Sequence, residues 1–337
     1  MIYLSIVYHI YSEISSVKKE KNKNSTKSRK KVDLEARKWY TERGISYFIY
    51  RKAYKMITLN NGQVKCLISE MGAEIKSIVR GGVEYMWEAD PKFWAQSAPI
   101  MFPICGGLKN GKYTYEGKEY QLSKHGFAKL NEFTVESADD TIAVFVLRDN
   151  ETTRESYPFE FEFKVTYRLE GDSVEVTYSA KNCGKNTMYC SFGAHEAYAT
   201  PEGIEAYDII FPQKETIYAY ALNGDLLTDY TKLIVEDSNV LPLKDEYFYL
   251  DALVFRGLKS RSAILRNREN GRSVKVEFPG FDYFLLWHKF TAPYICLEPW
   301  CGVQDVAGSS YEIAEKEGIH AVPAGESFIR THTITVG

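Results

Sequence analysis

Residues 295–302 read I-C-L-E-P-W-C-G and place one carboxylate, Glu298, in an otherwise apolar and aromatic run. The proline that follows restricts Glu298 to extended backbone, so the stretch is predicted to be a strand. A carboxylate in such surroundings is costly unless it is paired or used in chemistry. Apolar surroundings also raise a carboxyl pKa, which makes Glu298 a candidate general base near neutral pH.

Two histidines stand beside small residues that favour a ligand site. His125 lies in L-S-K-H-G-F-A, where the glycine directly after it predicts a tight turn that directs the ring into a cleft. His195 lies in S-F-G-A-H-E-A-Y, where residues 193–194 leave room for a ligand. Imidazole is the natural proton donor near neutral pH, so both are candidates for acid/base chemistry. We expect His320 and His332, near the terminal strand, to be structural.

A second acid and several aromatic residues extend this set. Asp251 is the single acid in Y-F-Y-L-D-A-L-V-F. A sugar has apolar C–H faces and polar hydroxyl edges, so a sugar site needs aromatic rings together with carboxylates and imidazoles. Taken singly, each of these residues could equally have a structural role, the acid as a hydrogen-bonded buried carboxylate and the aromatic residues as packed core side chains. The candidate aromatic platforms are Trp87, Trp94, Phe127, Trp287 and Trp300.

Other chemistries have little support. The chain lacks the phosphate-binding patterns G-x-x-x-x-G-K-[ST] and G-x-G-x-x-G before a helix, and it lacks the nucleophile motif G-x-S-x-G. No C-x-x-C pair occurs, and no histidine stands at zinc-ligand spacing from a cysteine, so no metal is predicted. The six cysteines, in a large chain without a convincing export signal, predict reduced thiols and a cytoplasmic protein.

The elements that must position these groups are predicted to be strands. Alternation of apolar and polar residues marks strands at 159–169, 173–179 and the C-terminal tail, and L-E-G-D predicts a hairpin turn between the first two. Residues 141–147 form a continuous apolar run typical of a buried strand. Helical periodicity is scarce. We therefore expect one large antiparallel β-sandwich over residues 56–337.

The N-terminal segment differs in charge from the rest. Residues 1–55 carry 14 Lys and Arg against 5 Asp and Glu, whereas residues 56–337 carry 28 against 40. The acidic body is a poor candidate for binding nucleic acid. The opening apolar run is too short to span a membrane. Residues 1–55 are predicted to be a basic extension that is disordered or no part of the fold.

The order of these blocks resembles the aldose 1-epimerase (galactose mutarotase) family, and most closely its LacX-like branch. The blocks are P-I-C-G-G-L-K-N-G followed by H-G-F-A, then G-A-H-E-A-Y, L-D-A-L-V-F and C-L-E-P-W-C-G, over residues 56–337. The resemblance implies a large antiparallel β-sandwich, the supersandwich. It also implies an enzyme that interconverts the α and β anomers of a free hexose without a cofactor.

The resemblance implies roles for five residues. Glu298 matches the general base, His195 the general acid and His125 the second active-site histidine. Asp251 matches the acid that holds sugar hydroxyls, and Lys109 stands where mutarotases usually have an arginine. Anomerisation removes a proton from the C1 hydroxyl and gives one to the ring oxygen. We therefore expect the base and the acid on opposite sides of the C1–O5 unit.

Departures from the family pattern leave the substrate open. The chain has L-S-K-H-G-F-A in place of L-H-G-G, and H-E-A-Y-A-T in place of H-x-Y-F-N-L. One alternative is a hexose-6-phosphate 1-epimerase, for which Lys109, Lys112 and Lys124 are candidate phosphate ligands. Others are a non-catalytic carbohydrate-binding or sensing protein and a glycoside hydrolase that uses Glu298 and Asp251. We expect a monosaccharide ligand and a monomer or homodimer.

Overall fold

The structure, a computed structural model, describes residues 39–42, 45–48, 54–249 and 251–337. The chain divides into two units, and Tyr54–Gly337 forms one compact unit. In the other unit, strands β1 (Trp39–Glu42) and β2 (Ile45–Phe48) pair antiparallel. The prediction of disorder for residues 1–55 falls mainly outside the described residues.

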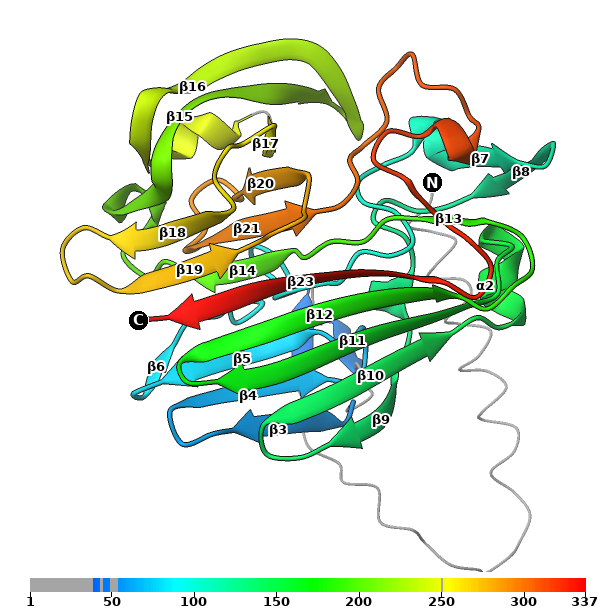
Figure 1. Cartoon of the computed structure of the whole chain (residues 1–337). Helices are drawn as coiled ribbons and strands as arrows, with labels where there is room; N and C mark the ends of the chain where they lie inside the picture. The colour runs from blue at the N-terminus through cyan, green and yellow to red at the C-terminus, as the bar shows by residue number, and fades with distance from the viewer. Residues whose placement is uncertain (1–38, 43–44, 49–53, 250) are drawn as a thin grey trace, which may run out of the picture. The chain divides into compact units, whose positions relative to one another are not determined.

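A 13-stranded sheet forms the larger part of the compact unit (Figure 1). All of its paired strands are antiparallel, as expected for strands joined by hairpins and short loops. In sheet order the strands are β14 (Glu196–Ala199), β21 (Tyr294–Trp300), β20 (Tyr283–Trp287), β17 (Leu253–Arg256), β15 (Tyr207–Asn223), β18 (Ser262–Asn267), β19 (Ser273–Glu277), β23 (Ser327–Val336), β12 (Ser173–Asn182), β11 (Phe161–Glu170), β10 (Ile142–Arg148) and β9 (Thr134–Ala138), with β16 (Leu226–Pro242) paired to β15.

Three smaller sheets and a few short turns complete the unit. The sheets are β3 (Met56–Asn60), β4 (Val64–Ser69), β5 (Ile75–Arg80) and β6 (Val83–Glu84); β7 (Lys112–Tyr115) and β8 (Lys118–Gln121); and β13 (Met188–Cys190) and β22 (His320–Val322). The helical segments are α2 (Glu151–Ser156) and the 3₁₀ turns η1 (Lys109–Gly111), η2 (Ala128–Leu130), η3 (Ile204–Ala206), η4 (Asp245–Phe248) and η5 (Ile313–Glu315). Within the described ranges, no helix has the length and apolarity needed to cross a membrane.

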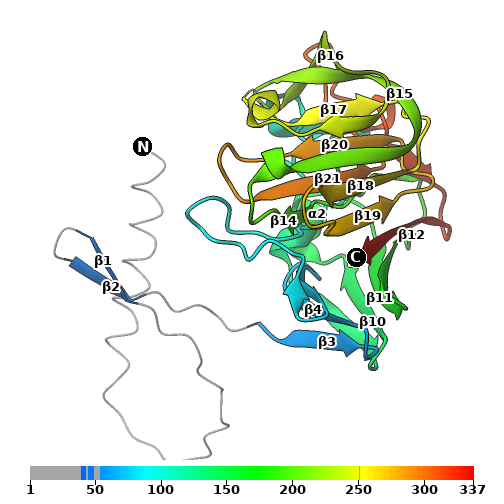
Figure 2. The same cartoon turned by 90° about the vertical axis from the view of Figure 1, so that its left-hand side faces the viewer.

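Strand alternation accounts for the layered core. Buried and less buried residues alternate through β11 and β12, because successive side chains in a strand point to opposite faces. The four-stranded sheet lies against the β9–β12 part of the large sheet (Figures 1 and 2), where the Tyr167 hydroxyl donates to the Ala73 carbonyl at 2.6 Å. The predicted all-β sandwich is confirmed, as are the strands at 141–147, 159–169 and 173–179.

The site is positioned by three neighbouring strands, β14, β21 and β20. Ile295 and Leu297 of β21 belong to the main core, whereas Tyr294, Cys296 and Trp300 belong to two smaller clusters on the other face. Glu298 is an even number of residues away from each member of this second group, so its side chain points to the same face of the sheet. In register, Leu285 and Trp287 of β20 stand opposite Glu298 and Cys296.

Candidate active site

A cavity of about 270 Å³ lies on this face of the sheet. It takes side chains from β20 and β21 and from the loops around residues 94–101, 124–129 and 251–252. Its lining combines aromatic rings with carboxylate, imidazole, amide and ammonium groups, a mixture suited to a polyhydroxylated ligand. The lining residues are Trp94, Gln96, Pro99, Met101, Lys124, His125, Lys129, His195, Leu222, Asp251, Ala252, Leu285, Trp287, Glu298, Trp300 and Gln304.

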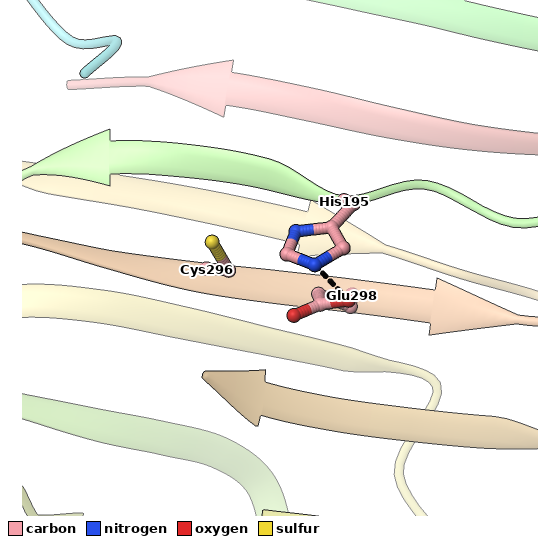
Figure 3. A group of neighbouring side chains, drawn as sticks. All are labelled: His195, Cys296 and Glu298. Atoms are coloured by element: carbon pink, nitrogen blue, oxygen red, sulfur yellow. Dashed lines mark ion pairs between the residues drawn. The ribbon is translucent and has the colours of Figure 1, made fainter. Parts of the chain in front are cut away.

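Glu298 and His195 are brought together by strand register. Glu196, the first residue of β14, pairs with Leu297, so His195 before it stands opposite Glu298 after it. The Nε2 atom of His195 lies 3.4 Å from Oε2 of Glu298 (Figure 3). This separation is too short for a sugar ring to lie between them. The two groups lie side by side, whereas the sequence predicted that they act from opposite sides of the C1–O5 unit.

Trp300 fixes the Glu298 carboxylate. Its indole Nε1 donates to Oε2 of Glu298 and to the Ala194 carbonyl, both at 3.1 Å. A Cβ atom at Gly193 would approach Cδ1 of Trp300 to 2.8 Å. The space that Gly193 leaves is thus filled by the indole ring, not by a ligand. Both contacts to Glu298 use Oε2, which leaves Oε1 as the oxygen available to a ligand.

Burial favours the uncharged form of each partner. The Glu298 side chain is 1% exposed and that of His195 is 12% exposed. Burial, followed by the nearby charge of Glu196, raises the pKa of Glu298 well above its usual range, while the Trp300 donor opposes the rise. Burial lowers the pKa of His195 well below its usual value. Both shifts favour a pair without net charge that holds one proton, with Glu298 protonated and His195 neutral.

His125 is held by a tight turn and a backbone hydrogen bond. His125 and Gly126 both have positive φ, 68° and 67°, and the Gly126 N–H donates to the Ser123 carbonyl at 2.9 Å. The backbone N–H of Gly106 donates to Nδ1 of His125 at 3.1 Å. Because Nδ1 accepts, the neutral ring carries its proton on Nε2. Burial, then electrostatic interaction with His195 and the positive charge of Lys129, keeps the pKa of His125 well below its usual value.

Aromatic rings and a second acid form the remaining walls. The His195 ring packs against both Trp94 and Trp287, with ring centroids 5.1 Å and 5.6 Å away, and the two tryptophan rings also contact each other at 5.2 Å. Asp251 lines the cavity and is partly buried, with φ of 103°. Asp251, Trp287 and Trp300 thus all line the cavity, as do Glu298, His195 and His125.

Two predicted ligand contacts are absent from the cavity lining. Lys109 begins the 3₁₀ turn η1, where its Nζ donates to the Ser309 carbonyl at 3.0 Å and lies 5.0 Å from the Tyr311 ring. Phe127 packs into the core, with its ring centroid 6.1 Å from that of Phe102. Local contacts direct both side chains away from this cavity, so the structure does not place Lys109 and Phe127 with the other predicted site residues.

Four polar lining residues had no assigned role from the sequence or only a weak one. Lys124, weighed as a phosphate ligand, is joined here by Lys129, whereas Gln96 and Gln304 carried no signal at all. Gln304 is 2% exposed, and its Oε1 atom is buried without a hydrogen-bond partner among the described residues. A buried amide oxygen of this kind is costly unless a ligand donates to it.

Comparisons with known proteins show the family to which this chain belongs. A sequence model of the aldose 1-epimerase family matches residues 55–308. The chain belongs to the aldose 1-epimerase family. Two of its relatives in this family are the plasmid and chromosomal LacX proteins of Lactococcus lactis subsp. lactis. Each is 31% identical over 296 residues, which cover 83% of this chain and 99% of the relative.

Solved structures place the family fold over most of this chain. The galactose mutarotase related enzyme from Lactobacillus acidophilus is 32% identical, with a TM-score of 0.80 over 84% of this chain and 97% of its own. A galactose mutarotase-like protein from Lactobacillus casei is 27% identical, with a TM-score of 0.78 over 84% and 100%. The family resemblance of the sequence blocks is confirmed.

Proposed function

We propose that this family member is an aldose 1-epimerase that interconverts the α and β anomers of a free hexose. The observation that carries the proposal is the Glu298–His195 pair, 3.4 Å apart in a cavity of about 270 Å³. The hydroxyl oxygen on C1 and the ring oxygen share one carbon atom, so they are close neighbours. Two adjacent proton-transfer groups therefore match two adjacent oxygens.

The proton cycle follows from the single proton of the pair. In the form with a Glu298 carboxylate and a His195 imidazolium, the carboxylate takes the C1 hydroxyl proton while the imidazolium gives one to the ring oxygen. The C1–O5 bond breaks, and an aldehyde and a new hydroxyl group form. After rotation about the C1–C2 bond, the reverse transfers close the ring on the other face and restore both groups.

Neighbouring groups orient the sugar in this proposal. The Nε2–H of His125 is a fixed donor for the ring oxygen or a hydroxyl group. Asp251 and the unpaired Oε1 of Gln304 accept from hydroxyl groups, and Trp287 offers an apolar ring to a C–H face. Indole and imidazole walls also exclude water, which strengthens each of these polar contacts.

Polarimetry of freshly dissolved α-glucose and α-galactose tests the proposal. Glu298→Gln keeps the side-chain volume and an acceptor for Trp300, so sugar binding should survive while kcat falls by about 10²–10⁴-fold. His195→Asn should lower kcat by a similar factor. The matched control is Glu119→Gln, at a surface ion pair with Lys112. Retention of the full enzymatic rate in Glu298→Gln would falsify the assignment.

A phosphorylated hexose is the second candidate substrate, because two ammonium groups face the cavity. Lys129 lines it, and the only hydrogen bond of its Nζ among the described residues is to the Lys124 carbonyl at 3.3 Å. Lys124 also lines it and pairs with Asp225 at 2.9 Å. Burial, then the charge of Lys124, lowers the pKa of Lys129, as expected for a cation lacking a counter-ion.

The rates with glucose and glucose 6-phosphate distinguish these two substrates. Lys129→Met should selectively reduce kcat/KM for the phosphorylated sugar, whereas Lys112→Met, outside the cavity, should change neither rate. Equal losses for both sugars would rule out a phosphate contact at Lys129. Sugar binding by calorimetry without acceleration of mutarotation would instead support the non-catalytic carbohydrate-binding or sensing alternative.

A further inference from the structure

The acid/base pair has a third neighbour that the proposed reaction does not use. Cys296 stands two residues before Glu298 on β21, so both side chains project from the same face. Its register partner on β14 is Ala197, and its partner on β20 is Trp287. Figure 3 shows the thiol, the imidazole and the carboxylate together on this face of the sheet.

These three groups lie close enough together to be candidate ligands of one metal ion. One ligand atom each from His195, Cys296 and Glu298 lie within 4.8 Å of one another. Tetrahedral zinc, with bonds of about 2.0–2.3 Å, holds its ligand atoms roughly 3.3–3.7 Å apart. The His195–Glu298 separation of 3.4 Å already meets this value, and the other separations, at most 4.8 Å, need to close by up to about 1.1–1.5 Å.

We propose that His195, Cys296 and Glu298 form a binding site for a borderline-soft divalent cation such as Zn²⁺, and that its occupation blocks the acid/base pair. Nitrogen, sulfur and oxygen donors together select zinc-like ions over Mg²⁺ or Ca²⁺. One thiolate and one carboxylate neutralise the +2 charge, which a site with Cys296 0% and Glu298 1% exposed requires. Three protein ligands leave a fourth coordination position for water or another ligand.

Metal binding and catalysis exclude each other at this site, since both need the lone pairs of His195 and Glu298. The predicted inhibition rests on the proposed function, whereas the predicted metal binding does not. His195 also has a buried Nδ1 without a hydrogen-bond partner among the described residues. The ring is therefore not tied by that atom and can adjust to a metal ion.

Cobalt spectroscopy tests the binding directly. Full-length protein stripped with a chelator is titrated with Co²⁺, and we expect one equivalent to produce a thiolate-to-cobalt charge-transfer band that Zn²⁺ abolishes. Cys296→Ala should remove the band and weaken Zn²⁺ binding by more than about 100-fold, because loss of an outer-shell partner alone costs about 10–100-fold. Cys183→Ala, at an exposed thiol, is the matched control and should keep the band.

Activity is measured separately, with each variant compared with its own metal-free rate. Zn²⁺ should inhibit the unmodified protein, a chelator should reverse this, and Cys296→Ala should resist. Cys296→Ser, which keeps the side-chain size, replaces it if the alanine variant fails to fold. A cobalt band that depends on Cys183, or no band at all, overturns the proposal. A Cys296-dependent band in a protein without mutarotase activity supports the site and refutes the proposed function instead.

Discussion

Replacement of Trp300 by phenylalanine probes the charge balance of the acid/base pair. The indole Nε1 donates to Glu298 Oε2 and to Ala194 O, both at 3.1 Å, and the indole ring centroid lies 5.4 Å from that of His125. Phenylalanine keeps an aromatic wall but removes the donor. A hydrogen bond to a charged acceptor contributes about 1.5–3 kcal/mol. Because this N–H is shared by two acceptors, we assign about 1 kcal/mol to its bond with Glu298.

The sign of the effect follows from which form the donor stabilises. The Trp300 N–H favours the Glu298 carboxylate, so its removal raises the Glu298 pKa further. The alkaline limb of kcat/KM, where the pair loses its proton, should move to higher pH. The plateau value of kcat/KM should fall by up to about fivefold. The reacting carboxylate–imidazolium form loses about 1 kcal/mol of stabilisation when the donor is removed.

Polarimetric kcat/KM measured across the pH range provides the assay, since that ratio reports groups of the free enzyme. Trp287→Phe is the control: this residue lines the cavity without a hydrogen bond to Glu298, so KM should change while the limb stays in place. An alkaline limb that stays in place or moves to lower pH in a folded Trp300→Phe protein would refute the reasoning.

Three further outcomes are expected. Gly126→Ala should lower the free energy of unfolding by at least about 1–3 kcal/mol in urea titrations and reduce kcat, because φ is 67° and a Cβ would overlap a backbone carbonyl. Lys316→Met should lower the free energy of unfolding by about 3–5 kcal/mol, because it leaves the buried Asp305 carboxylate without its cation. Lys275→Met, at an exposed ion pair, should lower it by less than about 1 kcal/mol. Since burial depresses the His195 pKa, kcat/KM should not fall as pH drops through 6.5, the usual histidine range; an acid limb there would contradict the one-proton pair.

Much of the fold could be predicted because strand alternation is local. Residues 159–169 show their inward and outward faces in the letters alone, and β11 (Phe161–Glu170) has that burial pattern. The turn L-E-G-D fixes the partner strand, since it leaves only two residues between Glu170 and Ser173. The order of strands across the 13-stranded sheet has no such local signal. It depends on pairings such as β14 with β21, whose residues are about a hundred positions apart.

In the candidate site, too, local features could be predicted from the sequence and long-range placement could not. Glu298 was visible as an acid in an apolar run, and His195 and His125 were visible beside small residues. Their mutual placement was not, because it depends on the β14–β21 register. The cavity lining includes Lys129, which the sequence did not single out, and not Lys109, since a lysine in a polar loop shows no sign of whether it faces a cavity. Cys296 resembled any apolar strand residue until the fold placed it beside His195 and Glu298.

Glu298 lies on β21 and His195 directly precedes β14, and the backbones of these two strands are hydrogen-bonded to each other. Apart from Trp287 on β20, the groups assigned to ligand recognition come from connecting segments: the turn at 123–129, the residues before β17 and the residues after β21. Reaction and recognition therefore have separate structural supports. Sequence change in the connections can alter which sugar is accepted while the distance between acid and base stays constant. Directed evolution of a new substrate preference should accordingly begin with libraries confined to those three connections.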